Sequence, residues 1–388
     1  MRRSVYLIFF AASIFALQAC SSSSSQKKIS FIDVVGSLSV PERDLPAGLI
    51  SIQTIVSIPL MDSTLLKYPV LYELNRNEAI ISSDSRVLLI DTEEGKVLLS
   101  LCRQGNGPQE YVEIGNVSAD WEQQELYVFD LQKRQALVYS FKGDYLRTVR
   151  PPRNACAGVN SFGNGLVWEM MSHGETTPWI YITDQEGHLV DSSKSMAPLT
   201  RSFMSFSPSL VKNGKDLFFM TFNSDSLYKI SGYSMVPEMI LSRGKKKMPI
   251  EYYSRYDLYY KYGKEYIVFG KYVVSEDLLF LEYDYKSAHY LDIWSPISGQ
   301  LIARRKLLLP EDSKGFPVTF DGEIRYFWPN WAQGNYLVEL DSSSESMELI
   351  VAELREWYTC HSKEKAICAD FSLPRVTVSG RHTFVVFP

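Results

Sequence analysis

A three-strand pattern recurs along this 388-residue chain and constrains its fold more than any other feature. Each copy has two short strands rich in aliphatic and aromatic residues around a polar turn, followed by a third strand after a second turn. The turns carry Gly, Asp, Asn or Ser, which tight hairpins favour. No long amphipathic helical stretch appears between these strands. Six copies occur, at residues 79–101, 125–149, 166–192, 217–241, 278–308 and 324–351.

A further strand candidate precedes most copies and brings each unit to four antiparallel strands. Examples are NVSAD, GVNSF, SPSLV and KYVVS. Repeats of roughly 40 to 60 residues with four strands each are typical of β-propeller blades. The pattern therefore predicts an all-β, six-bladed β-propeller of four-stranded antiparallel blades. The alternative that the same strands allow is a pair of β-sandwiches.

The two ends of such a ring must meet, because an open ring would leave unpaired strand edges. Residues 51–60 and 375–387 are both strand-like, so we expect one of them to complete a blade begun by the other end. Between the fourth and fifth units, residues 242–268 form a tyrosine-rich insert. Tyrosine suits positions with one apolar and one wet side. The insert is therefore either a helical lid or protein-contact surface, or a helix that its tyrosines pin to the propeller.

The N-terminus has the pattern of a targeting segment. Residues 1–19 join the basic start MRRS to an apolar stretch, as in a signal peptide, and are too short for a resident membrane span. LQAC, which ends at Cys20, resembles the lipobox of bacterial lipoproteins, and this implies cleavage before Cys20 and lipidation of its thiol. A plain secretory signal is the alternative. We expect residues 20–48, which open with SSSSSQKK, to be a flexible tether, and residues 49–388 to be the propeller domain.

Charge and cysteine content limit the classes of partner and cofactor that are expected. The formal net charge is −5, with 40 basic and 45 acidic residues, so no electrostatic attraction to nucleic acid is expected. No CxxC pair or Cys/His cluster has zinc spacing, so neither a metal nor another cofactor is expected. The sequence leaves open whether Cys360 and Cys368 form a disulfide, since such a bond would require a break in a helix there. The tether lacks the acidic cluster that resembles a surface-export signal, which favours the periplasmic side of a membrane.

The stretch RQGNGPQEYVEIG, residues 103–115, contains the sharpest motif. It lacks the Lys-Ser/Thr of a P-loop, and the strand-like residues after it exclude a dinucleotide fingerprint. We interpret it as the connection from the outer strand of one blade to the inner strand of the next. Gly105 and Gly107 would permit positive φ, Pro108 would fix the exit, and Glu110 and Tyr111 would bond or pack onto neighbouring backbone.

The same motif carries a family resemblance. Lipobox, six repeats and GNGPQEY together resemble the bacterial six-bladed β-propeller lipoproteins, a family of largely undefined function that is akin in fold to NHL-repeat and TolB-like propellers. The family motif looks like Gly-x-Gly-Pro-x-Glu-aromatic. The resemblance covers most of the chain after the tether, but only this motif is sharp.

Propeller topology places the candidate binding residues on one face. Connections between blades emerge on the same side as the loops between second and third strands, and loops on a rigid scaffold commonly carry function. The aromatic, basic and amide side chains of the sequence are concentrated in those loops. The candidate ligand-binding residues are Arg103, Asn106, Glu110, Arg134, His173, Trp328, Asn330 and Trp331.

Two classes of function remain. The first is a non-catalytic lipoprotein, held at the membrane by its lipid, that binds a protein, peptide or small ligand on the loop face; the scattered histidines form no visible nucleophile–base constellation. The second is a propeller-type hydrolase or lyase that acts on sugars or lactones through a central metal. Its ligands would converge from the loops: Glu110, Asp130, Asn223, Asp284 and Asn330.

Overall fold

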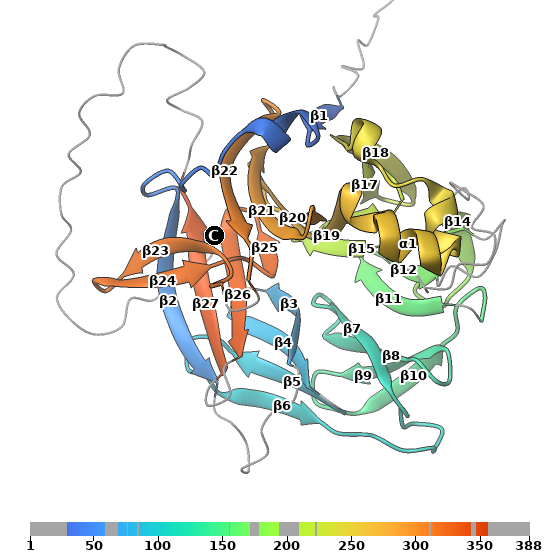
Figure 1. The fold of residues 1–388 in the computed structure, drawn as a ribbon. Helices are drawn as coiled ribbons and strands as arrows, with labels where there is room; N and C mark the ends of the chain where they lie inside the picture. The colour runs from blue at the N-terminus through green and yellow to red at the C-terminus, as the bar shows by residue number, and fades with distance from the viewer. Residues whose placement is uncertain are drawn as a thin grey trace, which may run out of the picture.

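The computed structural model describes residues 29–355 except 59–68, 76, 84, 155, 171–177, 194–208, 222, 310–311 and 343–346. Its regular structure is almost entirely β (Figure 1). Several predictions fall on residues outside this range: the signal peptide, lipidation of Cys20, the loop residue His173, the Cys360–Cys368 pair and the strand at 375–387.

Four separate antiparallel sheets have four strands each, paired in the sequential order of the chain. The first has β3 (Val70–Asn75), β4 (Glu78–Ser83), β5 (Arg86–Asp91) and β6 (Val97–Leu101). The second has β7 (Ile114–Asp120), β8 (Glu125–Asp130), β9 (Gln135–Ser140) and β10 (Tyr145–Val149). The third has β11 (Cys156–Phe162), β12 (Gly165–Met170), β13 (Ile180–Asp184) and β14 (Leu189–Ser192). The fourth has β19 (Val268–Val274), β20 (Leu279–Tyr285), β21 (Ala288–Ser295) and β22 (Gln300–Leu307).

A nine-stranded sheet and a hairpin complete the β structure. One half of the large sheet has β1 (Ser30–Asp33), β18 (Ser234–Ser242), β17 (Ser226–Ser231), β16 (Asp216–Met220) and β15 (Ser209–Asn213). The other half has β25 (Trp331–Gln333), β26 (Tyr336–Ser342), β27 (Met347–Leu354) and β2 (Ile50–Ile58). The halves meet at a single parallel pair, Asn213 with Ala332. The hairpin is β23 (Phe316–Phe320) with β24 (Glu323–Phe327).

The sheets stand around a common centre, as in a β-propeller (Figure 1). The first strands of consecutive sheets contact one another there, for example β3 with β7 and β7 with β11. The apolar cores lie between neighbouring sheets. One core packs Ile81 and Leu88 of the first sheet against Val338 and Leu349 of β26 and β27, so the first sheet and the last strands of the described chain lie side by side. The prediction of an all-β propeller is therefore confirmed.

Ring closure uses one of the two predicted strands. β2 pairs antiparallel with β27, from Ile50 opposite Leu354 to Ile58 opposite Met347. The prediction for the last repeat, by contrast, is wrong by one strand. Residues 324–327 belong to β24, which pairs only with β23 among the described residues, and the innermost strand is the short β25 that begins at Trp331.

The predicted tether, residues 20–48, is longer than the structure allows, because regular structure begins at Ser30. β1 adds a parallel fifth strand to β18, with Ile32 and Val34 fully buried. The 3₁₀ helix η1 (Gly36–Ser39) follows, and Arg43 then pairs with Arg304 of β22. We call residues 29–49 the N-terminal strap, since they run along the outer strands β18 and β22 before β2 pairs with β27.

The propeller has two opposite faces. Connections between sheets, together with the turns from second to third strands, emerge on what we call the crossover face. The remaining turns emerge on what we call the turn face. The tyrosine-rich insert lies on the crossover face, between β18 and β19, as η2 (Gly244–Lys246), η3 (Ile250–Ser254), α1 (Tyr256–Tyr262) and η4 (Gly263–Glu265). None of the helices in the described part of the chain has the length and apolar character needed to cross a membrane.

Candidate functional site

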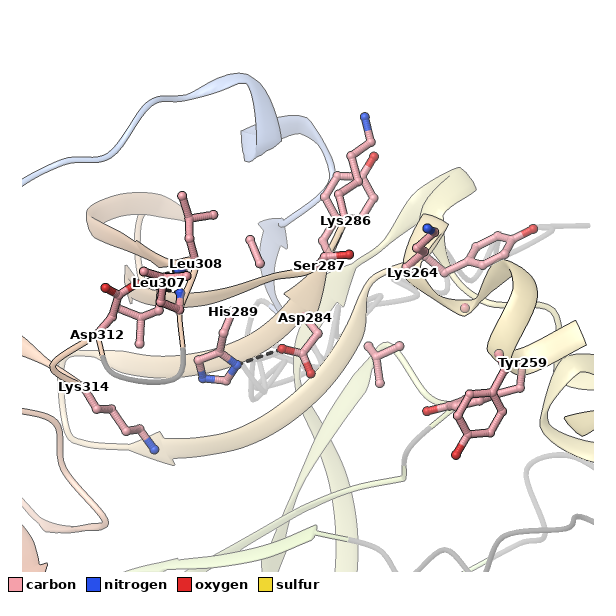
Figure 2. Close-up of a pocket in the computed structure, with 17 residues that line it drawn as sticks. Tyr259, Lys264, Asp284, Lys286, Ser287, His289, Leu307, Leu308, Asp312 and Lys314 are labelled. Carbon is pink, nitrogen blue, oxygen red and sulfur yellow. Dashed lines mark hydrogen bonds and ion pairs between the residues drawn. The ribbon is translucent and has the colours of Figure 1, made fainter.

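A cavity of about 620 Å³ opens on the crossover face. Figure 2 shows its three walls: the insert around Tyr259 and Lys264, the β20–β21 turn, and the end of β22 at Leu307 with the segment after it, which contains Leu308 and Asp312. We call it the tyrosine cavity, because four tyrosines line it. They are Tyr259, Tyr260, Tyr266 and Tyr285. Its volume is in the range of small-ligand sites.

An ion cluster borders the cavity. His289 Nδ1 lies 2.9 Å from Asp284 Oδ1, and Nε2 lies 3.4 Å from Glu282 Oε2 (the first contact is dashed in Figure 2). Glu282 also accepts hydrogen bonds from Lys314 Nζ at 2.8 Å and from the Trp328 indole at 2.7 Å. A buried carboxylate thus holds one side of the imidazole, and an exposed carboxylate holds the other.

These contacts fix the charges of the cluster. The hydrogen bonds from His289 to Asp284 and Glu282 raise the pKa of the imidazole to about 9, although burial opposes this. Burial would raise the pKa of Glu282, but its bonds with His289 and Lys314 outweigh that effect and hold the pKa at about 2. His289 is therefore an imidazolium and Glu282 a carboxylate at neutral pH. A cation that bonds to two carboxylates is poorly suited to act as a base but well suited to fix their orientation.

A third carboxyl group lies behind this cluster. Glu339 of β26 accepts the backbone N–H of Trp328 at 3.1 Å. Burial raises the pKa of Glu339 to about 8, so the group is largely protonated at neutral pH. Trp328 itself is 2% exposed and packs edge-on against Phe280. Trp328, one of the candidate ligand-binding residues, therefore belongs to the support of the site and presents no exposed face to a ligand.

The insert is anchored on one side and open on the other. Tyr253 and Met248 pack with Trp179 of the β12–β13 connection in a buried cluster. Tyr256 and Tyr260 of α1, by contrast, are more than half exposed, and their ring centroids lie 4.3 Å apart. Tyrosines thus pin the insert to the propeller on one side and present aromatic faces outward on the other.

The walls offer a mixture of groups suited to a polar ligand. Lys264 and Lys286 supply ammonium donors, Asp284 an exposed carboxylate acceptor, and the tyrosines both rings and hydroxyls. The opposite wall is held in shape by Asp312, whose carboxylate accepts the backbone N–H of Leu308 at 2.7 Å and that of Leu309 at 2.9 Å. Such a cavity can bind an extended polar molecule that has planar or ring faces.

The glycine motif lies elsewhere on the crossover face, between β6 and β7, and it is tightly braced. The buried Tyr111 donates its hydroxyl to Ser85 O at 2.6 Å and accepts from the Arg103 backbone N–H at 3.0 Å. Lys133 Nζ donates to Gly107 O and to Glu110 O at 2.8 and 2.7 Å. These bonds join the motif to neighbouring turns, as the structural interpretation expects.

The predicted reason for its glycines is wrong. Neither Gly105 nor Gly107 is among the positive-φ residues of the described chain. Instead, the Glu110 carboxylate folds back under the loop and accepts the Gly107 N–H at 2.8 Å. A Cβ on Gly105 would overlap that carboxylate, and one on Gly107 would lie 2.9 Å from Glu110 Oε2. The glycines therefore leave room for the Glu110 carboxylate, which a Cβ at either position would displace.

The remaining candidate residues do not gather at one place. Arg103 and Asn106 are exposed but lie outside the tyrosine cavity. Arg134, with φ 54°, donates to Cys156 O at 2.8 Å, and Asn330 accepts the Leu340 backbone N–H at 2.7 Å. Trp331 is buried and lines a different cavity, which opens among first-to-second-strand turns on the turn face. Its predicted place among the crossover-face loops is therefore wrong, and the misplaced last repeat is the cause.

The five oxygen ligands proposed for a central metal are not brought together in the described structure. Asp130, for example, is fully buried and accepts the backbone N–H groups of Val112, Gln132 and Lys133. Within the described ranges, one group of three acidic or histidine side chains has ligand atoms that all lie within 4.8 Å of one another: Asp184, Glu186 and His188, in the β13–β14 turn.

Sequence reasoning missed the ion cluster at the tyrosine cavity. Asp284 was singled out only as a metal ligand, and His289, Glu282 and Lys314 were not singled out. One signal was available: His289 lies five residues after Asp284 across the tight turn YDYKSAHY, which places both near the same hairpin end.

Comparisons with known proteins agree with the fold. The chain resembles the crystal structure of a Bacteroides fragilis NCTC 9343 protein inferred to be exported, with a TM-score of 0.61, 14% identity and coverage of 85% of this chain and 100% of that one. It also resembles a member of the DUF4221 family from Bacteroides vulgatus ATCC 8482, with a TM-score of 0.51, 10% identity and coverage of 81% and 99%. Identities this low show the fold alone. No curated protein matches the chain.

A family model covers most of the sequence. Residues 55–365 match the family described as Domain of unknown function (DUF4934). The matched range includes strands β3 to β27, the insert and the tyrosine cavity. The chain therefore belongs to the DUF4934 family, a family of unknown function, and it folds as a β-propeller.

Proposed function

We propose that this protein is a non-catalytic, lipid-anchored β-propeller of the bacterial cell envelope that binds a peptide or small polar ligand in the tyrosine cavity. The four separate sheets and the two halves of the nine-stranded sheet would be its six blades. The tyrosine-rich insert would join the fourth blade in chain order, which ends with β18, to the fifth, which begins with β19. Cys20, at the end of the lipobox-like LQAC, would carry the lipid.

The observation that carries the proposal is the tyrosine cavity itself. It combines a ligand-sized volume, exposed aromatic rings and an ion cluster whose charges are fixed before any ligand arrives. Preorganised polar groups next to aromatic surface favour binding, because little conformational freedom is lost when the ligand docks. Three separate chain segments converge to form it, on the face that was predicted to carry function.

An extracytoplasmic location is supported from two sides. The sequence begins with a signal-peptide pattern, and the Bacteroides fragilis protein of similar fold is inferred to be exported. Neither observation identifies the ligand. The chemistry of the cavity limits it to a molecule that offers hydrogen-bond acceptors to Lys264 and Lys286 and donors to Asp284.

The experiment is a ligand screen followed by variants in the cavity. A panel of short peptides and oligosaccharides is tested for an increase in the melting temperature of the purified protein, and hits are measured by calorimetry. Tyr260→Ala and Asp284→Asn should each weaken binding of a hit at least about tenfold, as expected for the loss of a real contact.

Lys142→Ala is the matched control, because Lys142 is an exposed residue in the β9–β10 turn on the opposite face. It should leave the affinity unchanged. Hits that bind both cavity variants as tightly as the wild type would contradict the proposed site.

A further inference from the structure

Three exposed apolar side chains lie together where the described chain begins. Ile29, Phe31 and Ile297 are 41%, 57% and 69% exposed. All three line one cavity, whose walls include the first-to-second-strand turns at Gly214, Glu276 and Gly334. The group therefore lies on the turn face, opposite the tyrosine cavity. We call Ile29, Phe31 and Ile297 the anchor-side patch.

The patch is held in place by backbone contacts. Ile32 is fully buried, and the alternation of a strand therefore turns Phe31 outward. Ile297 belongs to the turn between β21 and β22, and this turn lies directly against β1. A Cβ on Gly299 would lie only 2.5 Å from Phe31 O, so the two segments are in close contact.

The distance to the lipid is short. This step rests on the proposed lipid anchor at Cys20. Cys20 and Ile29 are nine positions apart in the sequence. A fully extended chain of that length spans at most about 32 Å, and a flexible one averages about 17 Å. The linker also contains Lys27 and Lys28, and basic residues next to a membrane are attracted to anionic headgroups.

We infer that the anchor-side patch rests on the phospholipid surface, with Ile29, Phe31 and Ile297 at the headgroup level. The turn face is then the membrane side of the protein, and the tyrosine cavity on the crossover face opens away from the membrane. A lipid-anchored domain on a short linker meets the bilayer first with the surface beside the linker. Apolar side chains at that place gain contact with the acyl boundary.

A rival apolar surface exists on the crossover face. Tyr256, Tyr260, Leu308 and Leu309 are all more than half exposed, and all but Tyr256 line the tyrosine cavity. Membrane contact there would cover the cavity. The position of the linker decides between the two surfaces, because β1 begins at the turn-face cavity.

The test is photo-crosslinking to lipid. The full-length protein is purified with its lipid and placed in vesicles of phosphatidylethanolamine and phosphatidylglycerol that contain a phospholipid with a diazirine near the headgroup. After illumination, adducts are mapped by mass spectrometry. We expect adducts on residues 29–33 and 295–299. Adducts concentrated on 256–262 or 307–309, equal labelling of both faces, or no adduct on the folded domain would overturn the inference.

Matched variants sharpen the result. Phe31→Ser and Ile297→Asp should each lower the adduct yield at the patch several-fold. Ile324→Asp, on β24, should not, although Ile324 is 67% exposed and thus comparable with Ile297. A patch buried instead between two copies of the protein would appear as a dimer of the Cys20→Ala protein in sedimentation, and this would also overturn the inference.

The mass of the N-terminal peptide is measured in the same samples. An unmodified Cys20 would show that the proposed anchor is wrong, and the premise of the inference would fail with it. A lipidated Cys20 with labelling on the wrong face would contradict the orientation alone.

Discussion

Arg304→Met should lower the stability of the protein and release the N-terminal strap from the propeller. Arg304 and Asp292 are 1% and 0% exposed, and two hydrogen bonds of 2.7 and 2.6 Å join the guanidinium to the Asp292 carboxylate. The same guanidinium donates to Ser37 O at 2.6 Å and to Val40 O at 3.2 Å in the strap, and to the Tyr283 hydroxyl at 2.9 Å. One buried cation thus connects two strands of a sheet to the strap.

The expected loss is large because the substitution leaves a carboxylate buried without its partner. Breaking a buried ion pair on one side costs about 3–5 kcal/mol. The strap carbonyls would lose their hydrogen-bond donor as well. Because the same side chain makes all these contacts, that loss overlaps with the cost of breaking the ion pair, and the two free energies are not added. Burial already raises the pKa of Asp292 against the effect of Arg304. In the variant the carboxyl group should protonate more readily, so the loss of stability should shrink as the pH falls.

A second variant separates the ion pair from the packing. In Arg304→Met with Asp292→Leu, no charge is left behind, and such replacements of a whole buried pair are often close to neutral. We therefore expect the double variant to recover much of the stability lost in the single one.

Guanidinium unfolding followed by tryptophan fluorescence measures these differences, and limited proteolysis of residues 34–43 reports on release of the strap. An Arg304→Met protein as stable as the wild type would refute the reasoning. A double variant as unstable as the single one would show that packing, and not the unpaired carboxylate, dominates.

Three further outcomes are expected. Cys20→Ser should remove the protein from the membrane fraction, and a mature-sized protein that still sediments with membranes would show that lipidation is not the anchor. Gly105→Ala should destabilise the fold by about 1–3 kcal/mol, because its Cβ would overlap the Glu110 carboxylate, and Glu110→Ala in the same chain should restore most of the melting temperature. The folded-state pKa of His289, about 9, lies above its ordinary 6.5, so its stabilisation is fully present below pH 6.5 and is lost as the pH rises through 9. The melting temperature of His289→Gln should accordingly fall less than that of the wild type between these pH values, and parallel curves would contradict the assignment.

Strands with strong local patterns were predictable from the sequence. Alternating apolar residues and Gly- or Asp-containing turns locate β4–β6 and β8–β10 nearly to the residue, because hairpin pairing is a local interaction. The last unit was misread for two physical reasons. Its inner strand, Trp331–Gln333, is too short to show alternation, and the hairpin before it has an equally strong strand pattern at 323–327.

The candidate site was predictable only in outline. Topology pointed to the crossover face, and composition pointed to the tyrosine-rich insert. The contact of His289 with Glu282 and the close approach of Glu110 to Gly105 depend on side-chain packing that spacing along the chain does not encode. Trp328 shows the same limit, since an aromatic residue next to a loop has the same sequence signature whether it is exposed or buried.

The most direct test of the proposed function is hydrogen–deuterium exchange of the protein alone and with a ligand found in the screen. The tyrosine cavity is lined by residues from the segments 259–268, 284–289, 307–309 and 312–314, so ligand binding should slow exchange in at least two of these segments. Exchange in the turn-face segments 29–33 and 295–299 should not change. Slower exchange confined to the turn face, or to the glycine motif at 103–111, would contradict the assignment of the tyrosine cavity as the binding site.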